Sequence, residues 1–510
     1  MKSGRSVISL FLCLLQVLLV MPRVYGFEVE THTLLSERAV QASGLNDFLT
    51  TVLPDEFPQG IGQVLRSGPF GNVQELVANV GAVNEDKPFT RSRHHFHDPT
   101  RLWNQAGLRW PVVGQVGNSS VLWGQHEDQG SGGKHSWKDA RDSYFNALTA
   151  TDPEERKGFF AETFESLGHL IHLVQDAAVP GHSRNDTHIG FFVGQGYGFP
   201  IGGPDRFHHW ARFKGGPAIA SAGSQPFNSS ILELSQNPLA PIPIARIIDA
   251  TDDDRGMPSG GDDIGIAEFS NGNFFSDDTI LKDYSFPNIS QLTQSPEPGP
   301  NGPALRNYLR KNSGPGPTGY RAAVASRLAA FLPAGFSNQQ WELYDHVMKD
   351  YGDLLFPRAI GYSAGLIDYF FHGQVMALIG NGAFATATSY PIEFLGSDFI
   401  SGFANPKQPA GTGVVVLVLL PKSATTGVTS RHVSQPQTVT IVPTINEGVP
   451  RVDLTMDFSS NPLPLPEWGD YDWDGYVVWR GPIAQLIGAH VTIVEQDGVL
   501  VSGDLSFWYD

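Results

Sequence analysis

The chain has 510 residues, of which 41% are hydrophobic and 17% are charged; at about 150 residues per domain, this is enough for two or three domains. This composition excludes a disordered chain, which would carry more charge and fewer aromatic residues. The 52 acidic and 34 basic residues give a formal net charge of −18. Such a surface repels the phosphates of nucleic acids and anionic lipids unless a metal or a local basic patch intervenes.

The first 26 residues have the pattern of a cleaved export signal. Two basic residues precede an apolar run over 7–21, and Gly26 ends a segment that suits cleavage. The run is short for a membrane span, and no later apolar stretch of about 20 residues follows. We therefore expect a secreted or periplasmic protein whose mature chain has no transmembrane span. Its single cysteine, Cys13, would be lost with the leader, so no disulfide would form.

Loss of the leader also changes the charge. Lys2, Arg5 and Arg23 would be removed, which leaves 31 basic residues against 52 acidic ones and a net charge of −21.

From residue 31 to about 177 the pattern is mainly helical. Apolar residues recur at helical spacing, and the segment 154–176 has the clearest buried stripe. Residues 190–319 are rich in Gly, Pro, Ser and Asp, and we expect loops with short helices at most. Helix is expected again over 321–332 and, with breaks, over 338–371.

After residue 373 the pattern becomes that of strands. They are expected at 414–420, 438–442, 452–456 and 477–479, and the runs 491–494 and 499–501 flank Asp497-Gly498, a hairpin turn signal. We therefore predict a mainly α catalytic domain over 27–373, with a loop-rich insertion around 190–319. A C-terminal all-β sandwich-like accessory domain is expected over 374–510.

Histidines are concentrated in the helical region, where 12 of the 16 lie between His32 and His209. On the helix predicted over 154–176, His172 and Asp176 are four residues apart and share one face. His182 follows the turn after that helix. A lone histidine is usually a hydrogen-bonded core residue, but three such groups at this spacing favour a zinc site.

A second segment, Arg93-His94-His95-Phe96-His97-Asp98-Pro99, has three histidines in four residues. If it is extended, His95 and His97 lie on one side. Not all three histidines can contact a metal, and the others would support the ligands or lie on the surface.

Four further residues are ordinary when each is considered alone. Asp86 lies in an acidic pair nine residues before His95. His32, His188 and His208 complete the set, and the case for the last two is weaker because their spacer is long and glycine-rich.

Together these segments resemble the zinc-dependent phospholipase C and S1/P1 nuclease superfamily. Its members carry a His-x3-Asp-x5-His motif followed by Asn, which is matched here by His172, Asp176, His182 and Asn185. They also carry an upstream His-Phe-x-Asp-Pro-like segment, matched at 95–99. The resemblance covers roughly 27–210 and implies a phospholipase C/P1 nuclease-like helical fold with up to three zinc ions; the β region lies outside it.

The resemblance implies a ligand set for two of these ions. One zinc would be held by His95, His172 and Asp176, with Asp86. A second would be held by His32, with Asp176 bridging, and by the amine and carbonyl of the mature N-terminus. In nuclease-type members a histidine lies five residues after the first residue, and Phe27 and His32 have that spacing.

The third ion would be held by His182, but the chain departs from the family there. Members supply a His-x3-Glu or His-x3-Asp pair on one helix. Here Arg212 lies four residues after His208 and Phe213 four residues after His209. His188 and His208 are the available substitutes, unless the third site is altered.

The activity that the resemblance implies is hydrolysis of a phosphodiester by a zinc-activated water, with Asp86 and Asp176 at the reacting centre. Asp86 could orient the water or act as a general base. Phospholipase C members recognise a choline headgroup with a carboxylate three residues past the first residue, the place of Glu30 relative to Phe27. A cation-binding carboxylate beside aromatic walls suits that headgroup, but Glu30 also suits a helix start.

Two alternatives remain open. An S1/P1-type zinc nuclease would need an aromatic slot for a base, and the loops offer Phe191, Phe192 and Tyr197. A catalytically degenerate metal-binding protein could instead present the β domain to a surface or a glycan.

The β region also contains a partial calcium motif. Asp470, Asp472 and Asp474 match the first half of a calcium loop, but the twelfth position is Gly481 rather than glutamate. A solvated acidic turn explains the same residues.

Overall fold

A computed structural model gives the structure of the chain. It describes residues 29–88, 90–110, 113–125, 129–130, 133–186, 206–225, 243–250, 264–300, 302–326, 341–344, 346–371, 373, 375–379, 386–395, 407–423, 425–427, 429–443, 451–464, 471–472, 474–487, 490–502 and 506–507. Phe27, His188, the aromatic residues Phe191, Phe192 and Tyr197, and Asp470 lie outside these ranges. Among the described residues, no helix has both the length and the apolar character needed to cross a membrane.

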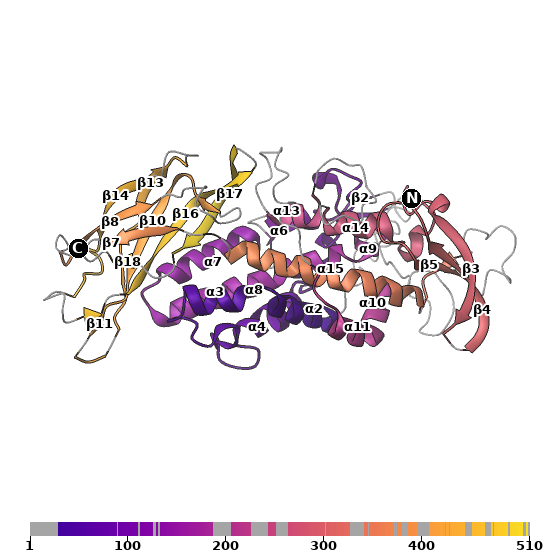
Figure 1. Cartoon of the computed structure of the whole chain (residues 1–510), viewed down its shortest axis with the longest axis horizontal. Helices are drawn as coiled ribbons and strands as arrows, with labels where there is room; N and C mark the ends of the chain where they lie inside the picture. Colours follow the sequence, from indigo (N-terminus) through magenta and orange to yellow (C-terminus); the bar gives the residue numbers. More distant parts are fainter. Residues whose placement is uncertain are drawn as a thin grey trace, which may run out of the picture.

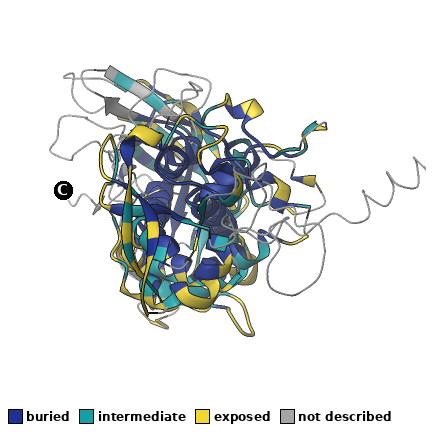
Figure 2. Cartoon of the chain, turned by 90° about the vertical axis from the view of Figure 1, so that its right-hand side faces the viewer, coloured by how far each residue is buried: buried dark blue, intermediate teal, exposed yellow. Residues whose placement is uncertain are grey.

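Two long helices run through the centre of the molecule (Figure 1): α8 (Pro153–Ala177) and α15 (His346–Phe371). Helix α8 begins sharply because Asp152 accepts hydrogen bonds from the backbone N–H of Glu154 and Glu155, and Pro153 needs no such partner. The buried residues, dark blue in Figure 2, gather in this helical interior. The prediction of a helix over 154–176 is confirmed.

Shorter helices surround this pair and supply the rest of the helical core. They are α2 (Val29–Ala42), α3 (Leu45–Val52), α4 (Val73–Glu75), η2 (Leu76–Gly81), α5 (Ala82–Asn84), α6 (Ser120–Gln125), α7 (Trp137–Thr149), α9 (Pro180–Ser183), α10 (Arg206–Trp210), η6 (Ala211–Gly215), α11 (Gly216–Ser221), α13 (Pro243–Ile248) and α14 (Ile266–Asn273).

The region 292–342 differs from the prediction, because it forms a four-stranded antiparallel sheet instead of loops and a helix. Its order is β3 (Leu292–Gly299), β4 (Gly302–Lys311), β5 (Tyr320–Ala325) and β6 (Trp341–Glu342). The prolines of β3 are tolerated because β3 is an edge strand. In β5 the alanine-rich run suggested a helix over 321–332, but the strand packs on α15, where the Tyr351 hydroxyl donates to the Ala322 carbonyl oxygen at 2.8 Å.

The C-terminal part is all-β, as predicted, and contains two principal sheets. They lie at the end of the molecule opposite to the sheet that contains β3–β6 (Figure 1). One has the order β12-β10-β16-β17, with β13 pairing β10 and β9 pairing β16. The other has the order β14-β8-β7-β18. The strands are β7 (Met376–Ile379), β8 (Ser389–Leu395), β9 (Gln408–Pro409), β10 (Gly411–Leu419), β12 (His432–Val433), β13 (Gln437–Ile441), β14 (Arg451–Asp457), β16 (Gly475–Ile487), β17 (His490–Val501) and β18 (Ser506–Phe507).

Strand β10 is buried on both faces, which explains its unbroken apolar sequence. Val415, Leu417 and Leu419 belong to a core shared by the two sheets. The alternate residues Val416 and Val418 belong to the core of the helical part. Because side chains alternate along a strand, one sheet closes the β-sandwich and also packs against the helices.

The predicted hairpin turn at Asp497-Gly498 is wrong. Strand β17 runs through it without a break, and Gly498 pairs with Gly481 of β16. The carboxylate of Asp497 accepts from the Arg480 guanidinium at 2.9 Å and 3.0 Å. Pairing along the whole of β16 outweighs the local turn preference of the dipeptide.

A buried ion pair joins the helical part to the β part. Arg141 of α7 donates from Nε and Nη2 to the two carboxylate oxygens of Glu495 at 2.8 Å and 2.9 Å. The Trp137 indole N–H donates to the same carboxylate at 2.9 Å. The side chains of Arg141 and Glu495 are only 2% and 3% exposed. Removing either partner would therefore leave the other as an uncompensated buried charge.

Replacing Glu495 with alanine should leave the Arg141 guanidinium buried without its carboxylate. We expect a loss of about 3–5 kcal/mol in the free energy of unfolding, measured by chemical denaturation. The matched control is Glu393→Ala, which removes an exposed pair with Arg451 and should cost less than about 1 kcal/mol. Equal effects of the two substitutions would contradict this role for Glu495.

Candidate metal centre

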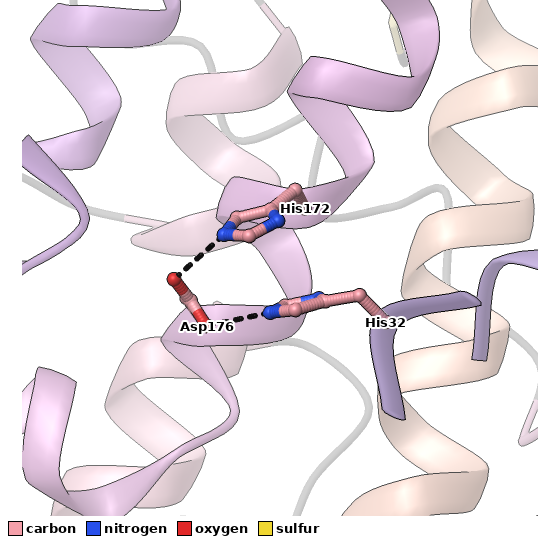
Figure 3. A group of neighbouring side chains, drawn as sticks. All are labelled: His32, His172 and Asp176. Atoms are coloured by element: carbon pink, nitrogen blue, oxygen red, sulfur yellow. Dashed lines mark ion pairs between the residues drawn. The ribbon is translucent and has the colours of Figure 1, made fainter. Parts of the chain in front are cut away.

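The carboxylate of Asp176 lies between histidines from two helices (Figure 3). Its Oδ1 is 3.2 Å from Nε2 of His32 on α2, and its Oδ2 is 3.1 Å from Nε2 of His172 on α8. The two imidazole rings stack at 3.7 Å between centroids. All three side chains are fully buried, and their ligand atoms lie within 4.8 Å of one another.

Two glycines allow the segment before Asp86 to approach α8 closely. A Cβ on Gly168 would lie 2.3 Å from the Val77 carbonyl oxygen, and one on Gly81 would lie 2.1 Å from the Glu165 carbonyl oxygen. Neither could be accommodated without moving the backbone. This contact brings the Ala82 carbonyl to His172, whose Nδ1 donates to it at 2.6 Å.

The outer nitrogens of His172 and His32 are both held by acceptors. The backbone carbonyl of Ala82 holds Nδ1 of His172. Nδ1 of His32 lies 2.7 Å from the Gln175 side-chain oxygen, and the Gln175 amide donates to Ser36. A carbonyl oxygen can only accept, so each Nδ1 carries a proton and each Nε2 faces Asp176, where it would become a metal ligand once deprotonated. This is the arrangement of histidines that bind metal ions.

A second group of ligand atoms lies beside the first. Nδ1 of His95 is 2.8 Å from Asp176 Oδ2, 3.2 Å from His172 Nε2 and 3.6 Å from Asp86 Oδ1. Asp86, His95 and His172 also place one ligand atom each within 4.8 Å of the others. Asp176 therefore presents Oδ1 to His32, and Oδ2 to His95 and His172.

The charges of this centre are strongly perturbed. Burial favours a raised pKa for Asp176, but His182, His172 and His32 outweigh it and hold that pKa well below its ordinary value. Burial raises the pKa of Asp86 to about 6. Burial alone would lower the pKa of His95, but hydrogen bonds to Asp176 and Glu85 raise it to about 10. Several carboxylates and imidazoles thus depend on one another for charge compensation.

This donor set suits zinc. Imidazole nitrogens and carboxylate oxygens are its usual ligands beside thiolates, and the mature chain is expected to have no thiol. The buried Oδ1 of Asp86 has no hydrogen-bond partner among the described residues, a state that costs free energy unless a cation occupies the space beside it. The residues present therefore fit the ion that the sequence implies.

His182 and His208 approach each other beside this group, and His182 Nδ1 lies 3.6 Å from Asp176 Oδ2. Their rings lie 5.2 Å apart at 77°, and His182 Nδ1 is 3.2 Å from the His95 carbonyl oxygen. Among the described residues, the groupings close enough to share one ion include neither of them. The structure thus brings His208 to His182 but leaves the composition of a third site open.

The other two histidines of the 94–97 segment have separate partners. His97 Nε2 pairs with Asp249 Oδ2 at 2.9 Å, and the Trp103 indole N–H donates to the same oxygen at 2.9 Å. His94 stacks on Trp123 at 3.9 Å. Only His95 of the three reaches Asp176.

Glu30 lies at the surface, in the first turn of α2. Its carboxylate is 3.1 Å from the Arg212 guanidinium. The Glu30 side chain is 58% exposed and that of Arg212 is 35% exposed. Arg212 occupies the place where the family resemblance led us to look for a carboxylate ligand. Its guanidinium instead pairs with the residue expected to recognise choline.

The calcium motif is only partly described. Asp472 belongs to β15 (Tyr471–Asp472), which pairs with β11 (Lys422–Ser423). The Asp474 carboxylate accepts from the Gly475 N–H at 2.6 Å. Calcium at Asp470, Asp472 and Asp474 stays a prediction.

Sequence reasoning did not identify Glu85, a buried carboxylate that contacts His95 of the centre. Glu85 is 1% exposed and receives hydrogen bonds from the Arg91 guanidinium, the Trp123 indole and the His169 imidazole. Despite its burial, hydrogen bonds from His169 and His95 and the charge of Arg91 hold its pKa well below the ordinary value. Its neighbour Asp86 drew attention through the spacing to His95, whereas Glu85 had no such signal.

Comparisons with known proteins add little. No family model matches the chain, and no curated protein matches it. Among solved structures, an alpha toxin from Clostridium absonum is 10% identical with a TM-score of 0.30, and an alpha-toxin from Clostridium perfringens avian strain SWCP is 11% identical with a TM-score of 0.26. Each match covers 95% of this chain and 99% of the other. Similarity at this level carries no weight for fold or function.

Gly168→Ala tests the close approach that builds the centre. The added Cβ would meet backbone atoms of Val77 and Gly81, and such overpacking typically costs about 1–3 kcal/mol. We expect a lower free energy of unfolding together with weaker zinc binding, measured by denaturation and by titration with zinc. Gly158→Ala is the control, because Gly158 lies on α8 with nothing within 4 Å; it should stabilise the helix by about 0.5–1 kcal/mol. Unchanged zinc binding by the Gly168 variant would contradict this account.

Proposed function

We propose that the chain is an exported zinc-dependent phosphodiester hydrolase of the phospholipase C type. The observation that carries the proposal is the pair of ligand groupings around Asp176, His32–His172–Asp176 and Asp86–His95–His172. The His-x3-Asp-x5-His motif from 172 to 182 and its resemblance to the phospholipase C and S1/P1 nuclease superfamily support it. Cleavage after Gly26 and export belong to the same proposal.

Zinc bound at this centre would supply Lewis acidity, which lowers the pKa of a coordinated water and neutralises charge on a phosphoryl group. The residues proposed to hold it are Asp86, His95, His172 and Asp176 for one ion, and His32, Asp176 and the N-terminus at Phe27 for a second. We assign His182 to a third ion, with His188 and His208 as its remaining candidates.

Asp86 is the residue proposed to move a proton. Its Oδ1 is buried without a hydrogen bond from the described residues, and burial raises its pKa to about 6. A carboxylate with this pKa is a better proton acceptor near neutral pH than an ordinary aspartate. In our proposal Asp86 orients the attacking water and accepts its proton at Oδ1, while Asp176 holds the surrounding imidazoles in place.

Glu30 is the proposed contact for a cationic headgroup. Its side chain is 58% exposed, three residues after Phe27, and its present partner, Arg212, is itself partly exposed. A quaternary ammonium group could replace that guanidinium at modest cost, because exposed ion pairs contribute little free energy. All the residues proposed to react or to hold zinc lie in the helical part. The β part, over 374–510, is therefore proposed as an accessory domain.

Asp176→Asn tests the metal centre with little change of side-chain volume. The amide cannot offer two anionic oxygens to four histidines, so zinc content and phosphodiester hydrolysis should fall together. The loss of activity should exceed the roughly 10–100-fold that is typical when a residue supporting a ligand is lost. His172→Ala should have the same effect. Zinc content by mass spectrometry and turnover of a chromogenic phosphodiester are the measurements. His209→Ala, on the exposed face of α10, is the control and should keep both. A metal-loaded, active Asp176 variant would refute the assignment.

The substrate class is tested by parallel assays on zinc-loaded protein that begins at Phe27. We expect release of phosphocholine from phosphatidylcholine vesicles and no cleavage of single-stranded DNA. Glu30→Gln should raise KM for the lipid and leave turnover of a headgroup-free phosphodiester unchanged. Cleavage of DNA alone would assign the chain to the nuclease alternative. Bound zinc without turnover of either substrate would favour the non-catalytic alternative.

A further inference from the structure

A second cluster of ligand residues lies on α8, one turn before the proposed centre. Glu165, His169, His172 and Asp176 follow one another at spacings of four, three and four residues, so all four share one face of the helix. The last two belong to the centre around Asp176. The first two meet His135, whose ring stacks on that of His169 at 3.8 Å and 3°.

His169 has the orientation of a metal ligand. Its Nδ1 is 2.5 Å from Glu85 Oε2, and because this carboxylate also accepts from Arg91 and Trp123, it acts as the acceptor and Nδ1 carries the proton. His169 is 2% exposed, and its Nε2 has no hydrogen-bond partner among the described residues. A buried imidazole held by a carboxylate on one nitrogen, with a lone pair left on the other, is the usual support of a metal-binding histidine.

The other two residues complete a donor set at the surface. Glu165 is 17% exposed, and its Oε2 accepts from the Arg66 guanidinium at 3.0 Å. His135 is partly buried, with Nδ1 3.3 Å from the Ser166 hydroxyl. The ligand atoms of His135, Glu165 and His169 lie within 4.8 Å of one another.

We propose that His135, Glu165 and His169 form an additional binding site for a divalent transition-metal ion of the zinc type. Two neutral imidazoles and one carboxylate are a common ligand set for zinc, with a fourth position left for water. Because the two rings stack, binding requires His135 to turn its lone pair out of the stack and toward the ion. The mixed nitrogen and oxygen donors disfavour calcium and magnesium, which prefer oxygen alone.

Glu85 connects this additional site to the centre around Asp176. Its Oε2 accepts from His169, and its Oε1 lies 3.5 Å from Nε2 of His95. One buried carboxylate therefore positions an imidazole of each site. This makes the additional ion a candidate for stabilising the segment that carries Asp86 and His95, rather than for contact with substrate.

Zinc stoichiometry of the full chain tests the additional site. We compare wild type, His135→Gln and Glu165→Gln after equilibration with buffered zinc, with circular dichroism to confirm folding; both substituted side chains are partly exposed, so the variants should fold. Each variant should bind one zinc ion per chain fewer than wild type. His432→Gln, in the β part, is the control and should bind the wild-type number. A wild-type number in either site variant would overturn the proposal.

Cobalt titration separates this proposal from the proposed function. In the His172→Ala background, cobalt should still bind at the additional site with visible d–d absorption, and adding His135→Gln should remove the part of the absorption that one bound ion contributes. This result is expected whether or not the centre around Asp176 hydrolyses phosphodiesters. A His172→Ala chain that binds no cobalt, or one whose absorption is unchanged by the second substitution, would contradict the additional site.

Discussion

The carboxylate of Asp176 is buried where water cannot reach it, and four imidazoles surround it. His32, His95, His172 and His182 all have a ring nitrogen within 3.6 Å of its oxygens. A buried carboxylate is tolerated only when cations or hydrogen-bond donors compensate it. Much of the helical part can be understood as the means of holding these four partners: α2, α8 and α9 supply one each, and the segment after α5 brings His95.

Helix α8 links this site to the rest of the molecule. Its buried face carries the ligand residues, and the Gly168 contact with η2 fixes how closely the Glu85–Asp86 segment can approach. Helix α7 packs beside it and pairs Arg141 with Glu495 of β17. The two-sided burial of β10 continues the core from the helices into the β-sandwich. The β part thus supports the helices that hold the site.

The sequence predicts what is periodic or locally spaced. It identified the helix that carries His172 and Asp176, and the apolar strand β10. It also indicated that His95 would lie near His172 and Asp176. It failed where tertiary packing decides, as in β5, whose alanine-rich run resembles a helix, and in β17, which overrides the Asp497-Gly498 turn signal. Glu85 and His135 could not be found from spacing to the main motif, because their contacts with His169 join residues 84 and 34 positions apart.

Anomalous scattering at the zinc edge, from crystals of the zinc-loaded chain beginning at Phe27, tests the central claim most directly. The account predicts zinc peaks on both sides of the Asp176 carboxylate, one beside His32 and one beside His95 and His172. A crystal containing bound zinc with no peak within coordinating distance of Asp176 would contradict it.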